Sequence, residues 1–328
     1  RTGGDFRRGW LMPPPPDSSS IRGSAILARP MNGIGDPTEL EALRARWVAA
    51  TEAGRLEEAY ALVEAAWRWA ESGADEETRA RLLCNRAALA IELGRGEEHL
   101  PRLRELMLRG AGRPSYRLAA YTLARGYELR REAKKGLFYA RLAFETSLQL
   151  GERDWIVSSQ NQIGNLLAAD GQFAEAVAAY EAALILESSP LPTAVTKYNL
   201  GYCLAVRGQV HDGLHHLLGS VRTLTRLGAE AHEARARLDL AYAWIEAGRP
   251  DRAARHAARA RELAERLGET ELRRNACFLL GRAAQKRGDG VSARLLFRQL
   301  QSDFYPDADY LVDLLVEEDL GSVINLKA

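Results

Sequence analysis

Glycines recur at nearly constant intervals along most of this chain, and their spacing limits what the chain can fold into. Successive members of the series lie 40, 77, 37, 40 and 40 residues apart: Gly54, Gly94, Gly171, Gly208, Gly248 and Gly288. The interval of 77 is close to two periods, and the segment "LRREAKKG" around Arg131 predicts a turn without glycine near its middle. Fixed periods of about 20–50 residues are typical of arrays of one repeated structural unit. The sequence therefore predicts about seven units with a mean period near 39 residues.

Small residues keep fixed distances from these turns. Seven residues before the turn lie Ala87, Ala124, Gly164, Gly201, Ala241 and Gly281. Five residues after it lie Ala59, Gly136, Ala176, Gly213, Ala253 and Ala293, and twelve after it lie Ala66, Ala143, Ala183 and Ala260. Larger residues stand nine after it: Val63, Leu103, Tyr180, Leu217 and Phe297. Since glycine inside a helix costs about 1 kcal/mol relative to alanine, its recurrence in phase predicts close packing of helix on helix.

The composition favours helices throughout. Hydrophobic residues make up 46% of the 328 residues and aromatic residues 7%, and Ala, Leu, Glu and Arg are frequent. No segment alternates Val, Ile or Thr with polar residues as a strand would, so we expect an all-α protein. The three cysteines, Cys84, Cys203 and Cys277, are far apart in helical sequence, which favours buried thiols over a disulfide framework.

The order of small residue, turn, small residue, aromatic residue and small residue resembles the tetratricopeptide repeat. The segment "IGNLLAADGQFAEAVAAYEAAL" at 163–184 is the best copy, followed by "LGYCLAVRGQ" at 200–209 and "LAYAWIEAGRPDRAARHAARA" at 240–260. The resemblance implies a right-handed superhelical solenoid of about seven helix-turn-helix repeats. Its period of 37–40 residues is similar to that of bacterial helical regulators that sense peptides. The third unit lacks the turn glycine, and His99 replaces the small residue of the second.

The two ends of the chain differ from the repeats. Residues 1–37 are rich in Gly, Pro and Ser, with "PPPPDSSS" among them, and we expect a disordered leader, since four prolines in a row forbid a helix. Because the chain begins with Arg, we expect either that it is a fragment or that Met31 is the natural start. The repeat domain is predicted at 38–300. Residues 301–328 are predicted to form an acidic capping helix with Leu311, Leu314 and Leu315 on one face, followed by a tail.

The resemblance also implies where a partner binds. The first helices of such repeats line a concave groove, and register places residues 13, 10, 6 and 3 before each turn in it. The groove candidates are Arg81, Tyr121, Arg125, Asn161, Asn165, Tyr198, Tyr202, Arg235, Tyr242, Asn275 and Arg282. Asn can both donate to and accept from a peptide backbone, Arg binds carboxylates, and Tyr supplies contact area. These side chains could also be half-buried packing residues with polar tips.

No sequence motif indicates catalysis or a cofactor. The chain has no phosphate-binding loop, no dinucleotide-binding glycine motif and no evident pair of nucleophile and base. His211 and His215 in "HDGLHH" superficially resemble a zinc motif, but the repeat register places both on the outer surface of a second helix, so no metal site is expected. The net charge is +1, and neither a signal peptide nor a transmembrane segment is evident, so a cytoplasmic protein is expected.

These observations favour a non-enzymatic interaction module that binds a peptide or protein in its concave groove. The alternative is a signalling or transcription-regulatory sensor whose DNA-binding or effector domain is missing from this chain. A third hypothesis is nucleic-acid binding through residues 222–298, which hold about seven more basic than acidic residues. Glutamates interleave with those arginines, so a set of solvated helix faces is the stronger interpretation. The oligomeric state is not indicated.

Overall fold

The structure is a computed structural model that describes residues 37–52, 55–71, 73–110, 112–317 and 327. Within these residues it is all helical, without a strand. The helices are α1 (Pro37–Glu52), α2 (Leu56–Glu71), α3 (Glu76–Glu92), α4 (His99–Arg109), α5 (Pro114–Leu129), α6 (Ala133–Leu150), α7 (Arg153–Ala169), α8 (Phe173–Leu186), α9 (Pro190–Val206), α10 (Val210–Leu227), α11 (Glu230–Glu246), α12 (Pro250–Leu267), α13 (Thr270–Lys286), α14 (Gly290–Phe304) and α15 (Leu311–Glu317).

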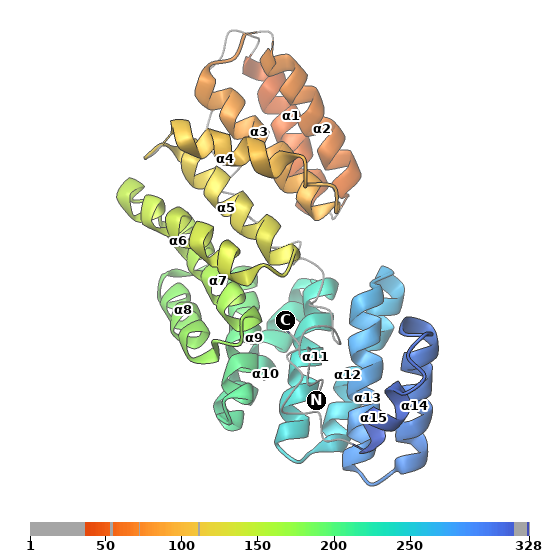
Figure 1. Cartoon of the computed structure of the whole chain (residues 1–328). Helices are drawn as coiled ribbons and strands as arrows, with labels where there is room; N and C mark the ends of the chain where they lie inside the picture. The colour runs from red at the N-terminus through yellow and green to blue at the C-terminus, as the bar shows by residue number, and fades with distance from the viewer. Residues whose placement is uncertain (1–36, 53–54, 72, 111, 318–326, 328) are drawn as a thin grey trace, which may run out of the picture. The chain divides into compact units, whose positions relative to one another are not determined.

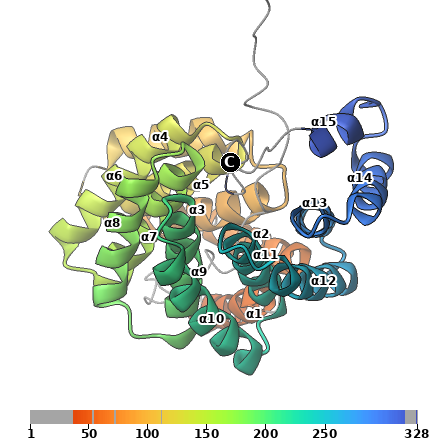
Figure 2. The same cartoon turned by 90° about the horizontal axis from the view of Figure 1, so that it is seen from below.

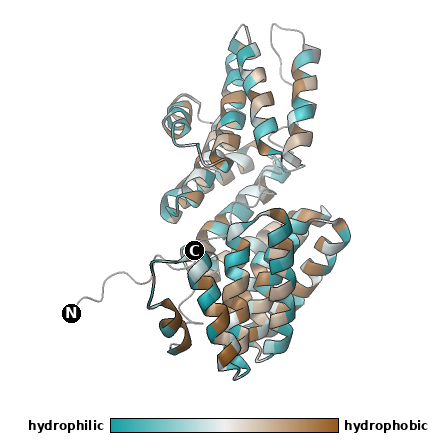
Figure 3. Cartoon of the chain, turned by 90° about the vertical axis from the view of Figure 1, so that its right-hand side faces the viewer, coloured by the Kyte–Doolittle hydropathy of each residue, from teal (hydrophilic) through white to brown (hydrophobic). Residues whose placement is uncertain are grey.

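Within the units, successive helices pack as pairs, α1 with α2, α3 with α4, α5 with α6, α9 with α10, α11 with α12 and α13 with α14, and α15 packs against α14 (Figure 1). We call the first, odd-numbered helix of each pair its A helix and the second its B helix. The predicted fold class, an all-α array of about seven helix-turn-helix repeats followed by a C-terminal helix, is confirmed. In α15 the buried residues are Leu311, Val312 and Leu315, whereas Leu314 is half-buried. Hydrophobic and hydrophilic residues are interspersed along the helices (Figure 3).

The described residues form two compact units, 37–166 and 167–317 with Lys327, and the boundary falls within α7. Each unit is described by itself below. The predicted leader, 1–37, lies outside the described residues except for Pro37, the first residue of α1. Residues 318–326 of the predicted cap and tail also lie outside them. A single repeat domain over 38–300 stays a prediction.

The turns inside the pairs lie where the glycine spacing predicts them. The φ angles of Gly94, Gly171, Gly208, Gly248 and Gly288 are all positive, between 66° and 81°. Glycine adopts this left-handed conformation without the steric penalty that a Cβ atom brings. Gly54 lies outside the described residues. The glycine-free turn predicted near Arg131 is confirmed, and Arg131 itself is left-handed there, with φ 59°.

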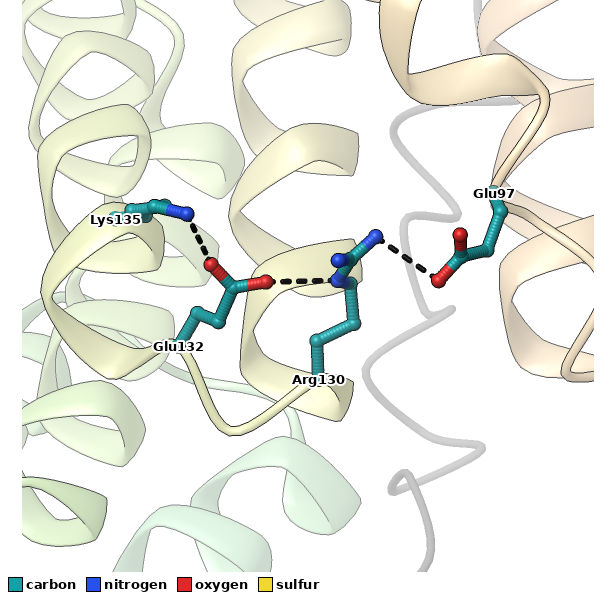
Figure 4. Close-up of polar contacts among 4 residues, drawn as sticks. All are labelled: Glu97, Arg130, Glu132 and Lys135. Carbon is teal, nitrogen blue, oxygen red and sulfur yellow. Dashed lines mark hydrogen bonds and ion pairs between the residues drawn. The ribbon is translucent and has the colours of Figure 1, made fainter.

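Charged side chains surround the Arg131 turn (Figure 4). Arg130 Nη1 lies 2.9 Å from Glu97 Oε1, on the preceding turn, and Arg130 Nε lies 2.8 Å from Glu132 Oε1. Glu132 also accepts a hydrogen bond from Lys135 on α6, and that bond lowers the pKa of Glu132. These exposed ion pairs hold both ends of a turn whose central residue has a strained backbone.

Replacing Arg131 by glycine is expected to stabilise the chain by about 0.5–1 kcal/mol. A left-handed conformation costs a residue with a Cβ about 1–2 kcal/mol, and the greater freedom of glycine in the unfolded chain offsets part of that gain. Thermal unfolding measures the change. Arg131→Ala is the matched control, because it removes the side chain but keeps the strain. An equal gain from both substitutions would contradict this explanation.

The positions predicted to lie between helices are buried. All the alanines five and twelve residues after the turn are at most 1% exposed: Ala59, Ala66, Ala143, Ala176, Ala183, Ala253, Ala260 and Ala293. The larger residues nine after the turn are equally buried: Val63, Leu103, Tyr180, Leu217 and Phe297. The turn spacing therefore predicts correctly which side chains fill the space between neighbouring helices.

The in-phase glycines mark close approaches of two helices. A Cβ atom added to Gly201 on α9 would lie 2.8 Å from the carbonyl oxygen of Gly213 on α10, and one added to Gly213 would lie 2.6 Å from the Gly201 oxygen. A Cβ atom on Gly281 would lie 2.3 Å from the ring of Phe297. Gly164 is buried as well. At Gly201, Gly213 and Gly281, steric exclusion of a side chain therefore explains the recurrence of glycine.

Candidate functional site

The eleven groove candidates all lie on A helices, and they are distributed between the two units. Unit 37–166 holds Arg81, Tyr121, Arg125, Asn161 and Asn165, and unit 167–317 holds Tyr198, Tyr202, Arg235, Tyr242, Asn275 and Arg282. Arg81, Asn161 and Asn165 are half-buried, and the other eight are buried. Their role in binding stays a prediction.

In unit 37–166 the candidates are engaged in local contacts. Arg125 lies 2.9 Å from both Glu92 and Glu128; burial lowers its pKa, but these two carboxylates more than offset that and raise the pKa above its usual value. The ring of Tyr121 packs edge-on against Trp155, with centroids 5.3 Å apart. Because two carboxylates already neutralise Arg125, its geometry indicates a structural role more than a carboxylate clamp.

In unit 167–317 the candidates come from three A helices in sequence, α9, α11 and α13. Helix α11 packs against α9 on one side and α13 on the other (Figures 1 and 2). We give one name, the A-helix face, to the six buried side chains that these helices contribute: Tyr198, Tyr202, Arg235, Tyr242, Asn275 and Arg282. The A-helix face therefore comprises three tyrosines, two arginines and an asparagine on adjacent helices.

Aromatic contacts join α9 to α11 on this face. The Tyr202 and Tyr242 ring centroids are 5.3 Å apart, and the Tyr198 hydroxyl lies 3.4 Å from Nδ1 of His232. Burial raises the pKa of Tyr242; Glu246 raises it further, and Arg282 lowers it. Arg282 on α13 is therefore close enough to Tyr242 to influence its ionisation.

Two hydrogen-bond acceptors that lie beside these residues, Asn199 on α9 and Asp239 on α11, were not identified from the sequence. Both are buried, 7% and 3% exposed, and Lys327 binds both. Its ammonium nitrogen lies 2.7 Å from Asp239 Oδ2 and 3.1 Å from Asn199 Oδ1. Burial raises the pKa of Asp239, and Lys327 and Arg235 lower it in part.

A register signal could have identified these acceptors. Asn199 and Asp239 each stand nine residues before their turn glycine, Gly208 and Gly248. The same position in earlier repeats also holds a buried polar residue: Asn85, Thr122 and Gln162. Polar residues that recur at a buried helical position need partners, since burial without a hydrogen bond is costly. The sequence interpretation used positions 13, 10, 6 and 3 before the turn and therefore passed over this one.

The two histidines singled out in the sequence lie on a B helix. His211 and His215 on α10 are exposed, as their register predicts. The three cysteines are buried and free, also as predicted, and burial raises the pKa of Cys203 to about 12. Among the described residues, no three metal-ligating side chains gather at one place, and no helix is long and apolar enough to cross a membrane.

The arginines of 222–298 are interleaved with acids in the structure as well. Five of them pair with acidic residues of the same stretch: Arg237 with Glu233, Arg259 with Glu262, Arg261 with Glu265, Arg266 with Glu230 and Arg287 with Asp251. Four of these five arginines have side chains that are 35–54% exposed, and their pairing with acids favours the interpretation of solvated surface over that of a basic stripe for nucleic acid.

Solved structures of known proteins share this fold. No protein-family model matches the chain, and neither does any curated protein sequence. The apo form of RapI is similar over 85% of this chain and 82% of its own, with 13% identity and a TM-score of 0.61. The apo form of the quorum sensor NprR from B. thuringiensis is similar over 86% of each chain, with 15% identity and a TM-score of 0.57.

A third similar structure is described as a tetratricopeptide repeat protein, from Parabacteroides merdae ATCC 43184. The similarity covers 85% of this chain and 98% of that one, with 14% identity and a TM-score of 0.53. Likeness at this identity concerns the fold, and it agrees with the helix pairs and turn spacing described above. The chain therefore has the fold of tetratricopeptide-repeat proteins, built from helix pairs that recur every 37–40 residues.

Proposed function

We propose that this chain is a non-enzymatic interaction module that binds a peptide or protein segment along the A-helix face. One observation carries the proposal: buried polar and aromatic side chains occupy adjacent positions on three consecutive A helices, α9, α11 and α13. Packing of the repeats alone does not require them, because the positions that face the B helices are filled with alanine, glycine and large apolar residues. Tyr and Arg, which this face contains, are enriched at protein interfaces.

The side-chain types on this face suit an extended peptide. Asn275 can both donate to and accept from a peptide backbone, and Arg282 can donate two parallel hydrogen bonds to a carboxylate. Tyrosines such as Tyr242 give a large contact area with few rotatable bonds. Asp239 adds an acceptor for a positively charged group. This combination supports binding of a peptide that has both polar and charged side chains.

The experiment is selection of peptides from a random display library on the wild-type chain, followed by titration calorimetry with face variants. Tyr198→Phe, Tyr242→Phe and Arg282→Gln should each raise the dissociation constant of the selected peptide about tenfold. Loss of a hydrogen bond to a charged or peptide group costs on the order of 1–2 kcal/mol, and about 1.4 kcal/mol corresponds to tenfold.

Matched controls lie away from this face in the same unit. Tyr310 is 51% exposed, and the side chain of Arg259 on α12 is 45% exposed. Tyr310→Phe and Arg259→Gln should leave the affinity within about twofold, since surface substitutions are usually within about 0.5 kcal/mol. Equal affinity of all five variants for the selected peptides would refute the assignment of the face.

The alternative function is a signalling or transcription-regulatory sensor, whose DNA-binding or effector domain is not in this sequence. It is favoured by the similarity in fold to NprR, which is described as a quorum sensor. In a sensor, peptide binding must favour one arrangement of the repeats over another. Small-angle scattering of the chain with and without a selected peptide separates the two: a change in the radius of gyration supports the sensor, and an unchanged value supports a simple binding module.

A further inference from the structure

Lys327 makes the most distant contacts described in this unit, and the four partners considered below lie on α9 and α11. Its ammonium group binds Asp239 and Asn199, which are 88 and 128 residues away in sequence. It also lies over two tyrosine rings, 5.1 Å from the Tyr198 centroid and 5.2 Å from that of Tyr202. Two acceptors and two ring faces therefore surround one cation.

This set of partners suits a primary ammonium group. An ammonium has three N–H donors and a compact charge, so it can bond to two oxygens while it contacts aromatic faces. Tyrosine rings attract a cation over their faces within about 6 Å, and the attraction is stronger where water is excluded. The side chains of Lys327 and Asp239 are only 12% and 5% exposed. The site therefore holds its cation largely away from water.

The oxygens and rings that contact Lys327 come from α9 and α11, helices that also pack through Tyr202 and Tyr242. A buried carboxylate is unfavourable without a positive partner. Asp239 therefore favours occupation by a cation, and another lysine of the same chemistry could replace Lys327.

We propose that Asp239, Asn199, Tyr198 and Tyr202 form a lysine-binding subsite of the A-helix face, occupied in the same chain by Lys327. The proposal rests on the function proposed above, and it assigns a peptide with a lysine side chain as the ligand. A peptide lysine enters by displacing Lys327. The contacts of Lys327 thus lower the apparent affinity for every peptide that uses this subsite, as any competing intramolecular ligand does.

The test uses the full chain and two synthetic peptides. One has the sequence of residues 318–328, EDLGSVINLKA, and its partner has glutamine in place of the lysine. Fluorescence anisotropy measures their binding to the wild type, to Lys327→Gln and to Lys327→Gln with Asp239→Asn. Asp239→Asn keeps the shape of the side chain but removes its charge. Asp212→Asn on the exposed side of α10 is the matched control.

Lys327→Gln is expected to bind the lysine peptide at least tenfold more tightly than the wild type does, and at least tenfold more tightly than it binds the glutamine peptide. Adding Asp239→Asn should abolish that preference, and adding Asp212→Asn should preserve it. The proposal is overturned if Lys327→Gln binds both peptides equally or binds neither.

Failure here is distinguishable from failure of the proposed function. Library peptides that depend on Tyr242 and Arg282, together with no preference for lysine, would overturn only the subsite. The opposite result would overturn only the general binding role: Lys327→Gln prefers the lysine peptide, but the face variants do not weaken the binding of any library peptide.

Discussion

Gly281→Ala is expected to lower the free energy of unfolding by about 2–3 kcal/mol. The added Cβ atom would lie 2.3–2.9 Å from three ring atoms of Phe297, which is fully buried. Overpacking of this kind costs about 1–3 kcal/mol or more, and the higher helix propensity of alanine returns at most about 1 kcal/mol. Thermal unfolding should show a midpoint about 5–10 °C lower.

Two further variants test the steric explanation. Gly219 on α10 has no atom within 4 Å of an added Cβ, so Gly219→Ala should raise the free energy of unfolding by about 0.5–1 kcal/mol. Phe297→Leu in the Gly281→Ala background should recover part of the loss, because it removes the ring atoms that clash. A midpoint for Gly281→Ala equal to that of the wild type would contradict the close-packing account of the repeats.

Arg125→Met is expected to destabilise the chain by about 3–5 kcal/mol. Its guanidinium lies 2.9 Å from Glu92, whose side chain is 3% exposed, and 2.9 Å from Glu128. Removing one partner leaves a buried carboxylate without a compensating charge, which is much more costly than the pair itself is favourable. Chemical denaturation measures the loss, and Arg125→Met with Glu92→Leu should recover most of it.

An exposed ion pair of the same unit is the control. Arg113 lies 3.4 Å from Glu76, and their side chains are 53% and 68% exposed. Arg113→Met should cost less than about 1 kcal/mol, since solvent screens such pairs. Similar losses from Arg113→Met and Arg125→Met would show that burial is not the source of the effect.

The repeat architecture could be predicted from the sequence because its steric requirements recur. Gly201 and Gly281 stand at the same distance before a turn, and each faces a neighbour that leaves no space for a side chain. Phe297 and Leu217 likewise stand at one register position and are both fully buried. The Arg131 turn was predicted from the doubled interval, whereas the left-handed conformation of that arginine is visible only in the structure.

The candidate site was only partly predictable. Register places Tyr198 and Tyr202 on an A helix, and the structure brings Tyr202 together with Tyr242. Asp239 is harder to recognise from the sequence as a site residue, because a single acidic residue in a helix is usually exposed. The contact of Lys327 with Asp239 spans 88 residues and depends on the packing of α11, so no local pattern indicates it.

The central claim is that partners bind along α9, α11 and α13. The most direct test is a library-selected peptide that carries a photoreactive diazirine, with the crosslinked residues of the chain mapped by mass spectrometry. The account predicts crosslinks within the A helices, at 190–206, 230–246 and 270–286. Crosslinks confined to the B helices, at 210–227 and 250–267, would contradict it.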